Sequence, residues 1–206
     1  HKGWSSPVNV LAHALLARQA GCSLVGNLLG DFVRGVPPAH WPSAWHDGVR
    51  LHRRLDRFVD AHPASARSVA RLPADHRRWA RVALDVSYDP LLARAWTQHA
   101  DLPLPRFAGL VYAALDAQRG HLPAGLARFA DFMAGRDLLV GYGDPDVIAE
   151  VLARMCGRVR RPNPLAALVP ALRAADTGIG EDFAVLFPAA RGFARAEVAR
   201  RRAHSA

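Results

Sequence analysis

The chain has 206 residues, 50% of them apolar and 22% charged, a balance typical of one globular domain with a substantial core. It contains no run of about 18 uncharged apolar residues, which argues against a membrane-spanning helix. Its two cysteines, Cys22 and Cys156, lie far apart, which argues against a thiolate zinc site and favours a reducing compartment. The formal net charge of +9 predicts an anionic partner such as nucleic acid, anionic lipid or an acidic protein.

Apolar residues recur at helical spacing along the chain without a convincing alternation of period two, so the sequence predicts an all-α fold. One multi-helix domain is expected over residues 7–203, whereas residues 1–6 differ from the rest and are expected to be an artificial extension. A secretory pattern is absent at the N-terminus, so a cytoplasmic protein is expected. Helices are predicted over residues 7–19, 24–34, 43–61, 64–71, 74–99, 107–119, 123–134, 144–158, 164–175 and 179–202. Pro90 predicts a kink in the helix over 74–99.

The predicted helix over 43–61 carries ionisable side chains within its apolar face. At about 100° per residue, one stripe of this helix holds Trp45, Val49, His52, Asp56 and Val59. The opposite side holds Arg50, Arg53, Arg54 and Arg57. Because burying an unpaired carboxylate is costly, such a group normally has a cation or a metal as its partner. His52 and Asp56, at i and i+4, can hold one ion from the same helix face. Alternatively, they pair with each other or with an Arg and only stabilise the core.

The same anomaly recurs on neighbouring predicted helices. Asp31 lies beside an apolar stripe of the second helix, Asp85 and Asp89 stand at i and i+4 in the fifth, and the first helix holds His13. Carboxylates that point inward from three helices would repel one another unless a cation lay among them. A mixed set of His and carboxylate ligands without Cys suits Mg²⁺, Mn²⁺ or Fe. Such an ion promotes hydrolysis of phosphoryl or ester bonds.

At these residues the chain resembles the acyl carrier protein phosphodiesterases, a divergent family of the histidine–aspartate (HD) metal phosphohydrolases. The resemblance covers roughly residues 9–100 and is carried by the stretches NVLAH (9–13), GNLLGDFVRG (26–35), LHRRLD (51–56) with Asp60, and LDVSYD (84–89). It implies an HD-like helical enzyme that removes 4′-phosphopantetheine from the serine of holo acyl carrier protein and requires Mn²⁺ or Mg²⁺. The family usually has His where this chain has Pro90, a departure that bears on the role of Asp89.

The helical positions and the resemblance together predict roles for the individual residues. Asp31, His52 and Asp56 are expected to be metal ligands and catalytic residues, with Asp85 and Asp89 as further ligands. His13 is expected to be a ligand or the acid that protonates the leaving serine oxygen, the alternative being an ordinary core residue. Asp60 is expected to accept a hydrogen bond beside the site or to be a solvated cap. The side chains expected to hold the substrate phosphate or the acidic carrier are those of Arg53, Arg54 and Arg57.

Two other functions stay open at this stage. One keeps the metal but changes the substrate to a nucleotide or another small phosphoester. The other is a non-enzymatic, basic helical module that binds nucleic acid or protein. It explains the charge but not the inward acids, and no recognised nucleic-acid motif is readable, so nucleic acid is not the expected partner. The oligomeric state is left open.

Overall fold

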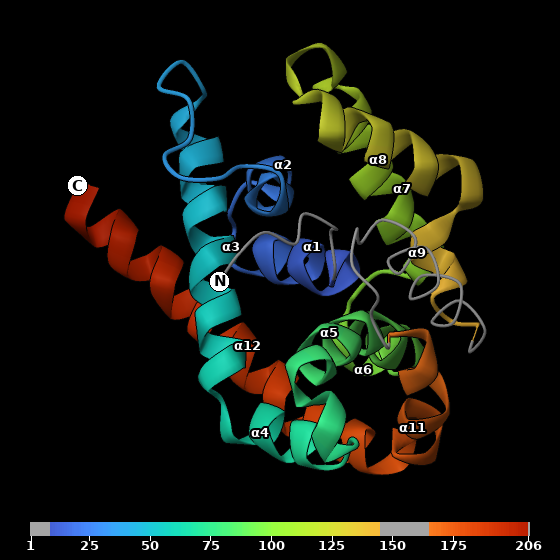
Figure 1. The fold of residues 1–206 in the computed structure, drawn as a ribbon. Coiled ribbons are helices and arrows are strands. Elements are labelled where there is room, and N and C mark those ends of the chain that lie inside the picture. The colour runs from blue at the N-terminus through green and yellow to red at the C-terminus, as the bar shows by residue number, and fades with distance from the viewer. Residues whose placement is uncertain (1–8, 145–164, 206) are drawn as a thin grey trace.

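The computed structural model describes residues 9–144 and 165–205, and within these ranges the chain is all-α, without a β-strand (Figure 1). This confirms the predicted fold class; the predicted helix over 144–158 lies almost entirely outside the described residues. The α-helices are α1 (Val10–Gln19), α2 (Leu24–Leu28), α3 (Ser43–Ala61), α4 (Pro63–Ala70), α5 (Arg77–Arg94), α6 (Trp96–His99), α7 (Leu104–Asp116), α8 (Ala124–Arg136), α9 (Leu138–Gly141), α11 (Val169–Ala174) and α12 (Asp176–Ser205). Short 3₁₀ turns are η1 (Leu29–Asp31), η2 (Ala74–His76), η3 (Arg119–His121) and η4 (Ala166–Leu168).

Helix α3 has the predicted bounds, but the predicted helix over 74–99 is divided. The turn η2 precedes α5, which continues through Pro90 and ends at Arg94, and α6 follows after Ala95. Proline lacks the N–H of the i to i−4 bond, and the break comes one turn later rather than at the proline itself. The second predicted helix is also shorter than expected, because α2 tightens into η1 at Leu29.

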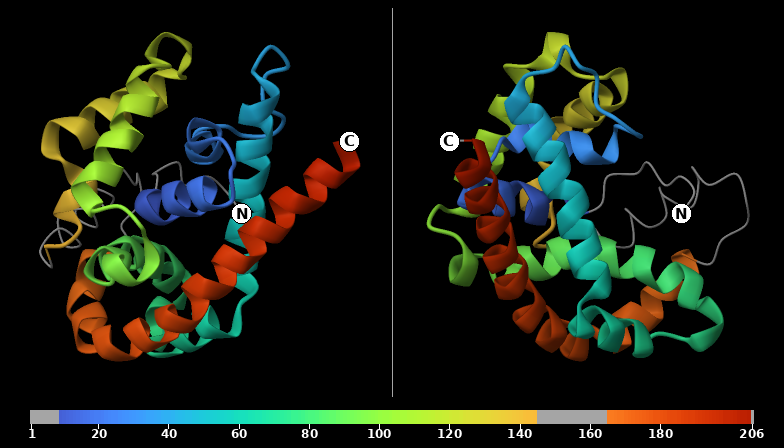
Figure 2. Two further views of the ribbon diagram at one scale, coloured as in Figure 1. Left: turned by 180° about the vertical axis from the view of Figure 1, so that it is seen from behind. Right: turned by 90° about the vertical axis from the view of Figure 1, so that its left-hand side faces the viewer.

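Helix α1 is the centre of the fold. Its residues from Val10 to Ala17 are all buried, and it packs against α2, α3, α5 and α12, which surround it (Figures 1 and 2). A helix that is covered on all sides needs apolar or partnered side chains around its whole circumference. His13 is therefore a polar residue in a position that demands a specific partner.

Two glycines allow α2 and α3 to approach closely. A Cβ atom at Gly48 would lie 2.3 Å from the carbonyl carbon of Gly26, and one at Gly26 would lie 2.6 Å from Trp45 Cα. Because the obstructing atoms belong to the backbone, neither position accepts a larger residue without separating the helices. This close contact brings η1, which directly follows α2, alongside α3.

The long helix α12 crosses α3 and also contacts α1, and the view from behind shows it running across α3 (Figure 2). It is fixed to α4 through the buried carboxylate of Asp182, which accepts hydrogen bonds from Arg67, Ser68 and Arg71. None of the described helices combines the length and hydropathy that a bilayer crossing requires.

Candidate metal centre

His52 and Asp56 lie on the inner face of α3, and His52 is the more deeply placed of the two. The His52 side chain is 3% exposed, and its Nε2 lies 3.3 Å from Asp56 Oδ2 and 3.4 Å from Asp31 Oδ1. Asp56 is half exposed, at 50%, so the centre opens to solvent on its side. The Asp31 carboxylate reaches His52 from η1, and a Cβ atom at Gly30 would lie only 2.2 Å from His52 Cγ. Glycine at that position is what lets η1 pass against the imidazole.

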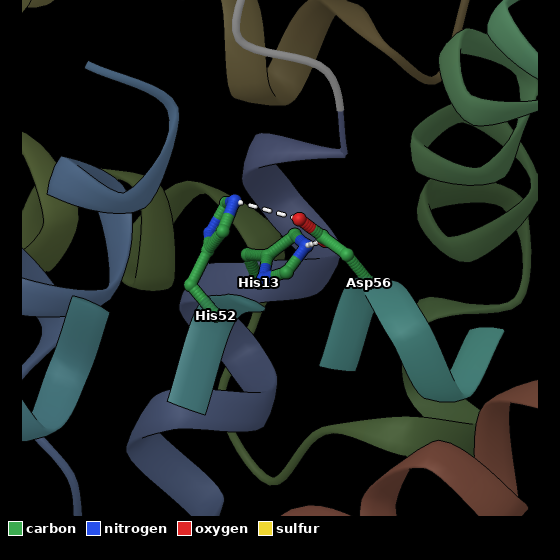
Figure 3. Close-up of side chains that lie close together, drawn as sticks. All are labelled: His13, His52 and Asp56. Carbon is green, nitrogen blue, oxygen red and sulfur yellow. Dashed lines mark ion pairs between the residues drawn. The ribbon is translucent and has the colours of Figure 1, made fainter. Parts of the chain in front are cut away.

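His13 joins this pair from α1. Its Nε2 lies 3.1 Å from Asp56 Oδ1, and its ring stacks on that of His52 with centroids 4.0 Å apart (Figure 3). The other ring nitrogen of His13, Nδ1, lies 3.2 Å from Asn27 Oδ1. The Asn27 amide nitrogen donates to the Gly48 carbonyl. Because the Asn27 oxygen can only accept, it assigns the proton to Nδ1 of His13 and leaves a lone pair on Nε2 when the ring is neutral.

The ring nitrogens and the carboxylate oxygens face each other as acceptors unless a proton or a metal ion lies between them. A neutral His13 would direct its Nε2 lone pair at the Asp56 carboxylate, and a His52 with an unprotonated Nε2 would face two carboxylates. A proton or a metal ion relieves both conflicts. His13, His52 and Asp56 offer one ligand atom each within 4.8 Å of one another, which suits a metal ion. The donor set, two imidazoles with carboxylates, is one that several divalent metal ions accept.

Protonation of His52 meets the same need when no metal is bound. Burial alone disfavours the imidazolium, but the carboxylates of Asp31 and Asp56 outweigh it and raise the pKa of His52 to about 10. Burial would likewise raise the pKa of Asp56, but the charge of His52 and hydrogen bonds from both histidines hold it well below its usual value. Among the described residues, His52 Nδ1 is buried without a hydrogen-bond partner. A proton and a metal ion would therefore compete for His52 Nε2.

Asp85, on α5, adds negative charge to the same region. Its partly buried carboxyl has a pKa raised well above the usual value, first by burial and then by the charges of Asp60, Asp56 and Asp31. A hydrogen bond from the Asn9 side chain acts in the opposite direction. The charges of the carboxylates on α3 and η1 therefore raise the pKa of Asp85. The predicted role of Asp85 as a metal ligand stays a prediction.

Asp89 lies one turn further along α5 and is used differently. Its oxygens accept hydrogen bonds from the backbone N–H groups of Leu11 and Ala12, each at 2.9 Å, at the start of α1. Burial raises the pKa of Asp89 to about 7, although these N–H groups favour the charged form. Asp89 therefore holds the N-terminus of the helix that carries His13, and its predicted role as a ligand stays a prediction.

The predicted substrate arginines lie on the outer part of α3. Arg53 donates to the carbonyl oxygens of Val33 and Gly35, both at 2.7 Å, and so fastens the loop that follows η1. Arg54 pairs with Glu197 of α12 at 2.5 Å, whereas Arg57 is exposed. Asp60 is exposed too and pairs with Arg81 of α5.

Sequence reasoning about single residues missed Asn9 and Asn27. Asn27 is completely buried and orients His13, and Asn9 adopts a left-handed conformation with φ of 60° where α1 begins. Asn9 and Asn27 both stand next to apolar runs, as the acids do. A side-chain amide in such a position needs a hydrogen-bond partner when it is buried, and this pattern would have identified both residues in the sequence.

The fold and the donor set define a class of all-helical proteins in which two stacked imidazoles and nearby carboxylates form a possible metal-binding group in a partly open site. Comparison with known proteins narrows this class. The family described as "Acyl carrier protein phosphodiesterase" matches residues 8–190. Acyl carrier protein phosphodiesterases of Salmonella paratyphi A, Salmonella agona and Salmonella newport are each 37% identical over 159 residues, which is 77% of this chain and 82% of theirs. No solved structure matches the chain.

The chain therefore belongs to the acyl carrier protein phosphodiesterase family, which confirms the resemblance seen in the sequence motifs. The match extends well beyond the first hundred residues, into α12.

Proposed function

We propose that this protein is a metal-dependent phosphodiesterase that releases 4′-phosphopantetheine from the serine of holo acyl carrier protein and leaves the apo carrier. The observation that carries the proposal is the group formed by His13, His52 and Asp56, whose ligand atoms lie within 4.8 Å of one another, in a chain of this family. The proposed setting is the cytoplasm, where such a carrier serves fatty acid biosynthesis.

The residues that would hold Mn²⁺ or Mg²⁺ are His13, His52, Asp31 and Asp56, with Asp85 beside them. When bound, the cation would polarise the phosphodiester and lower the pKa of a water molecule. The protein's own part is to fix the donors before the substrate arrives. Asn27 sets the tautomer of His13, Gly30 admits η1 against His52, and Asp89 holds α1 in place.

The reaction adds one water molecule to phosphorus and breaks the bond between phosphorus and the serine oxygen. The serine oxygen leaves with a proton, and the phosphopantetheine leaves as a phosphate monoester. His13 has two possible parts in this step, because its Nε2 can either hold the cation or carry the proton that the serine oxygen takes. The exposure of the Asp56 side chain supports entry of the phosphodiester from that side of the centre.

The test is to incubate the protein with holo acyl carrier protein and Mn²⁺ and to weigh the carrier by mass spectrometry. The expected result is loss of the phosphopantetheine mass with Mn²⁺ and no change with EDTA. A carrier that stays intact while nucleotides or other small phosphoesters are hydrolysed would replace this substrate with the smaller class. An inert protein that shows no metal-dependent stabilisation would refute the metal centre itself.

A further inference from the structure

The last turns of α12 and the outer side of α3 enclose a basic groove of about 550 Å³. The sequence presents its arginines as two unrelated groups, one on the helix over 43–61 and one at the C-terminal end. The fold joins them, because α12 crosses α3 on this side (Figure 2). The arginines that line the groove are Arg50, Arg54, Arg200, Arg201 and Arg202.

The groove keeps a positive charge after its internal ion pairs are formed. Its five arginines face two acidic residues, of which Glu197 pairs with Arg54 and Arg200, and Asp47 pairs with Arg201. These arginines stay accessible even when paired: the Arg54 side chain is 42% exposed and that of Arg200 is 60% exposed. Arg50 is exposed as well. Exposed cations that outnumber their acidic neighbours attract and orient an anionic partner.

The groove is connected to the metal centre by the exposed face of α3. Successive residues turn by about 100° on a helix, so Arg53 and Arg57 lie between Asp56 on one side and Arg50 and Arg54 on the other. A helix is about 10–12 Å across with its side chains. A basic strip one helix wide thus runs from the open side of the centre to the groove.

We propose that this groove and strip form the docking surface for an acidic face of the carrier protein, a proposal that rests on the proposed function. The scissile bond joins phosphorus to a serine of the carrier, so the carrier itself has to lie against the mouth of the centre. A protein partner typically covers about 800 Å² of each surface. A carrier placed with its serine at Asp56 therefore extends over α3 and brings its neighbouring surface onto the groove, where opposite charge favours it.

Binding of fluorescently labelled holo acyl carrier protein, measured by anisotropy without added metal, tests this surface independently of turnover. The double variant Arg50→Glu/Arg200→Glu should weaken binding at low salt by about tenfold or more, as expected for reversing charges that steer a partner. It should also raise KM for the carrier and leave kcat unchanged. The matched control Arg106→Glu/Arg128→Glu changes net charge equally at exposed positions of α7 and α8, and should bind as the wild type does.

Equal loss in the groove variant and the control would overturn the proposal, because net charge alone would then explain binding. Unchanged carrier binding by the groove variant would overturn the proposal as well. If the same variant lost affinity for duplex DNA while its carrier binding stayed unchanged, the groove would be a nucleic-acid site and the proposal would be wrong. If the groove variant does not fold, Arg50→Gln/Arg200→Gln serves in its place, with an intermediate loss expected. Groove-dependent binding without release of phosphopantetheine would refute the proposed function and leave the docking surface supported.

Discussion

Replacing His52 should change how the stability of the metal-free protein depends on pH. The pKa of His52 is raised from 6.5 to about 10, so the folded protein keeps a proton that the unfolded chain releases. For such a group the stabilisation is fully present below pH 6.5 and is lost as the pH rises towards about 10. Each pKa unit corresponds to about 1.4 kcal/mol, so the whole contribution is on the order of 5 kcal/mol.

Between pH 7.0 and 8.5 the His52 contribution should fall by about 2 kcal/mol. In a protein of this size that loss lowers Tm by roughly 4–8 °C. We expect thermal unfolding in EDTA to show this decline in the wild type and to show much less of it in His52→Gln, which cannot take up the proton. Subtracting the pH dependence of Tm in His52→Gln from that in the wild type cancels the contribution of groups that titrate in both proteins, such as Asp89.

Adding Mg²⁺ should reduce the decline in the wild type, because the cation then replaces the proton among Asp31, His52 and Asp56. Mg²⁺ stays soluble over this pH range and is the appropriate probe. Parallel pH profiles for the wild type and His52→Gln in EDTA would refute the reasoning, since they would mean that His52 holds no extra proton in the folded protein.

Three further predictions concern single positions in and around the centre. We expect Asp31→Ala and Asp56→Ala each to fold but to lose turnover, and to lose the rise in Tm that Mn²⁺ gives the wild type. A rise in Tm equal to that of the wild type would exclude these two residues as ligands. Gly30→Ala should destabilise the protein by about 1–3 kcal/mol in urea unfolding, since its Cβ would overlap His52; unchanged stability would show that η1 can move aside. Asp89→Ala should cost about 1–3 kcal/mol by leaving buried N–H groups of α1 without an acceptor; Asp89→Asn, which keeps one acceptor oxygen, should lose less in the same unfolding experiment.

The sequence by itself determined the all-α class and the helix that carries the centre of the site. Helix α3 could be predicted to its ends because its signals are local: helical spacing of apolar residues, and a proline following its last turn. The pairing of His52 with Asp56 follows from the same periodicity, because residues four apart share one face of a helix. The family motifs are equally local and could be read without the fold.

The tertiary structure decided which distant residues meet, since that depends on how helices pack rather than on any one helix. Only packing shows that the His13 ring stacks on His52 and is oriented by Asn27. Asp85 and Asp89 share a stripe of α5, and only packing gives them different surroundings. The pKa of Asp85 is raised by the charges of other carboxylates, whereas Asp89 accepts hydrogen bonds from the backbone at the start of α1.

The basic groove is the clearest case of a feature that no local pattern contains. Arg50 and Arg200 lie 150 residues apart in the sequence, on two different helices. Within its own helix, each arginine looks like an ordinary solvent-exposed residue on the polar face. They line one groove because α12 crosses α3, and where the two helices meet the ring of Phe58 stacks on that of Phe193. Hydrophobic burial sets that crossing, and the arrangement of charge on the surface follows from it.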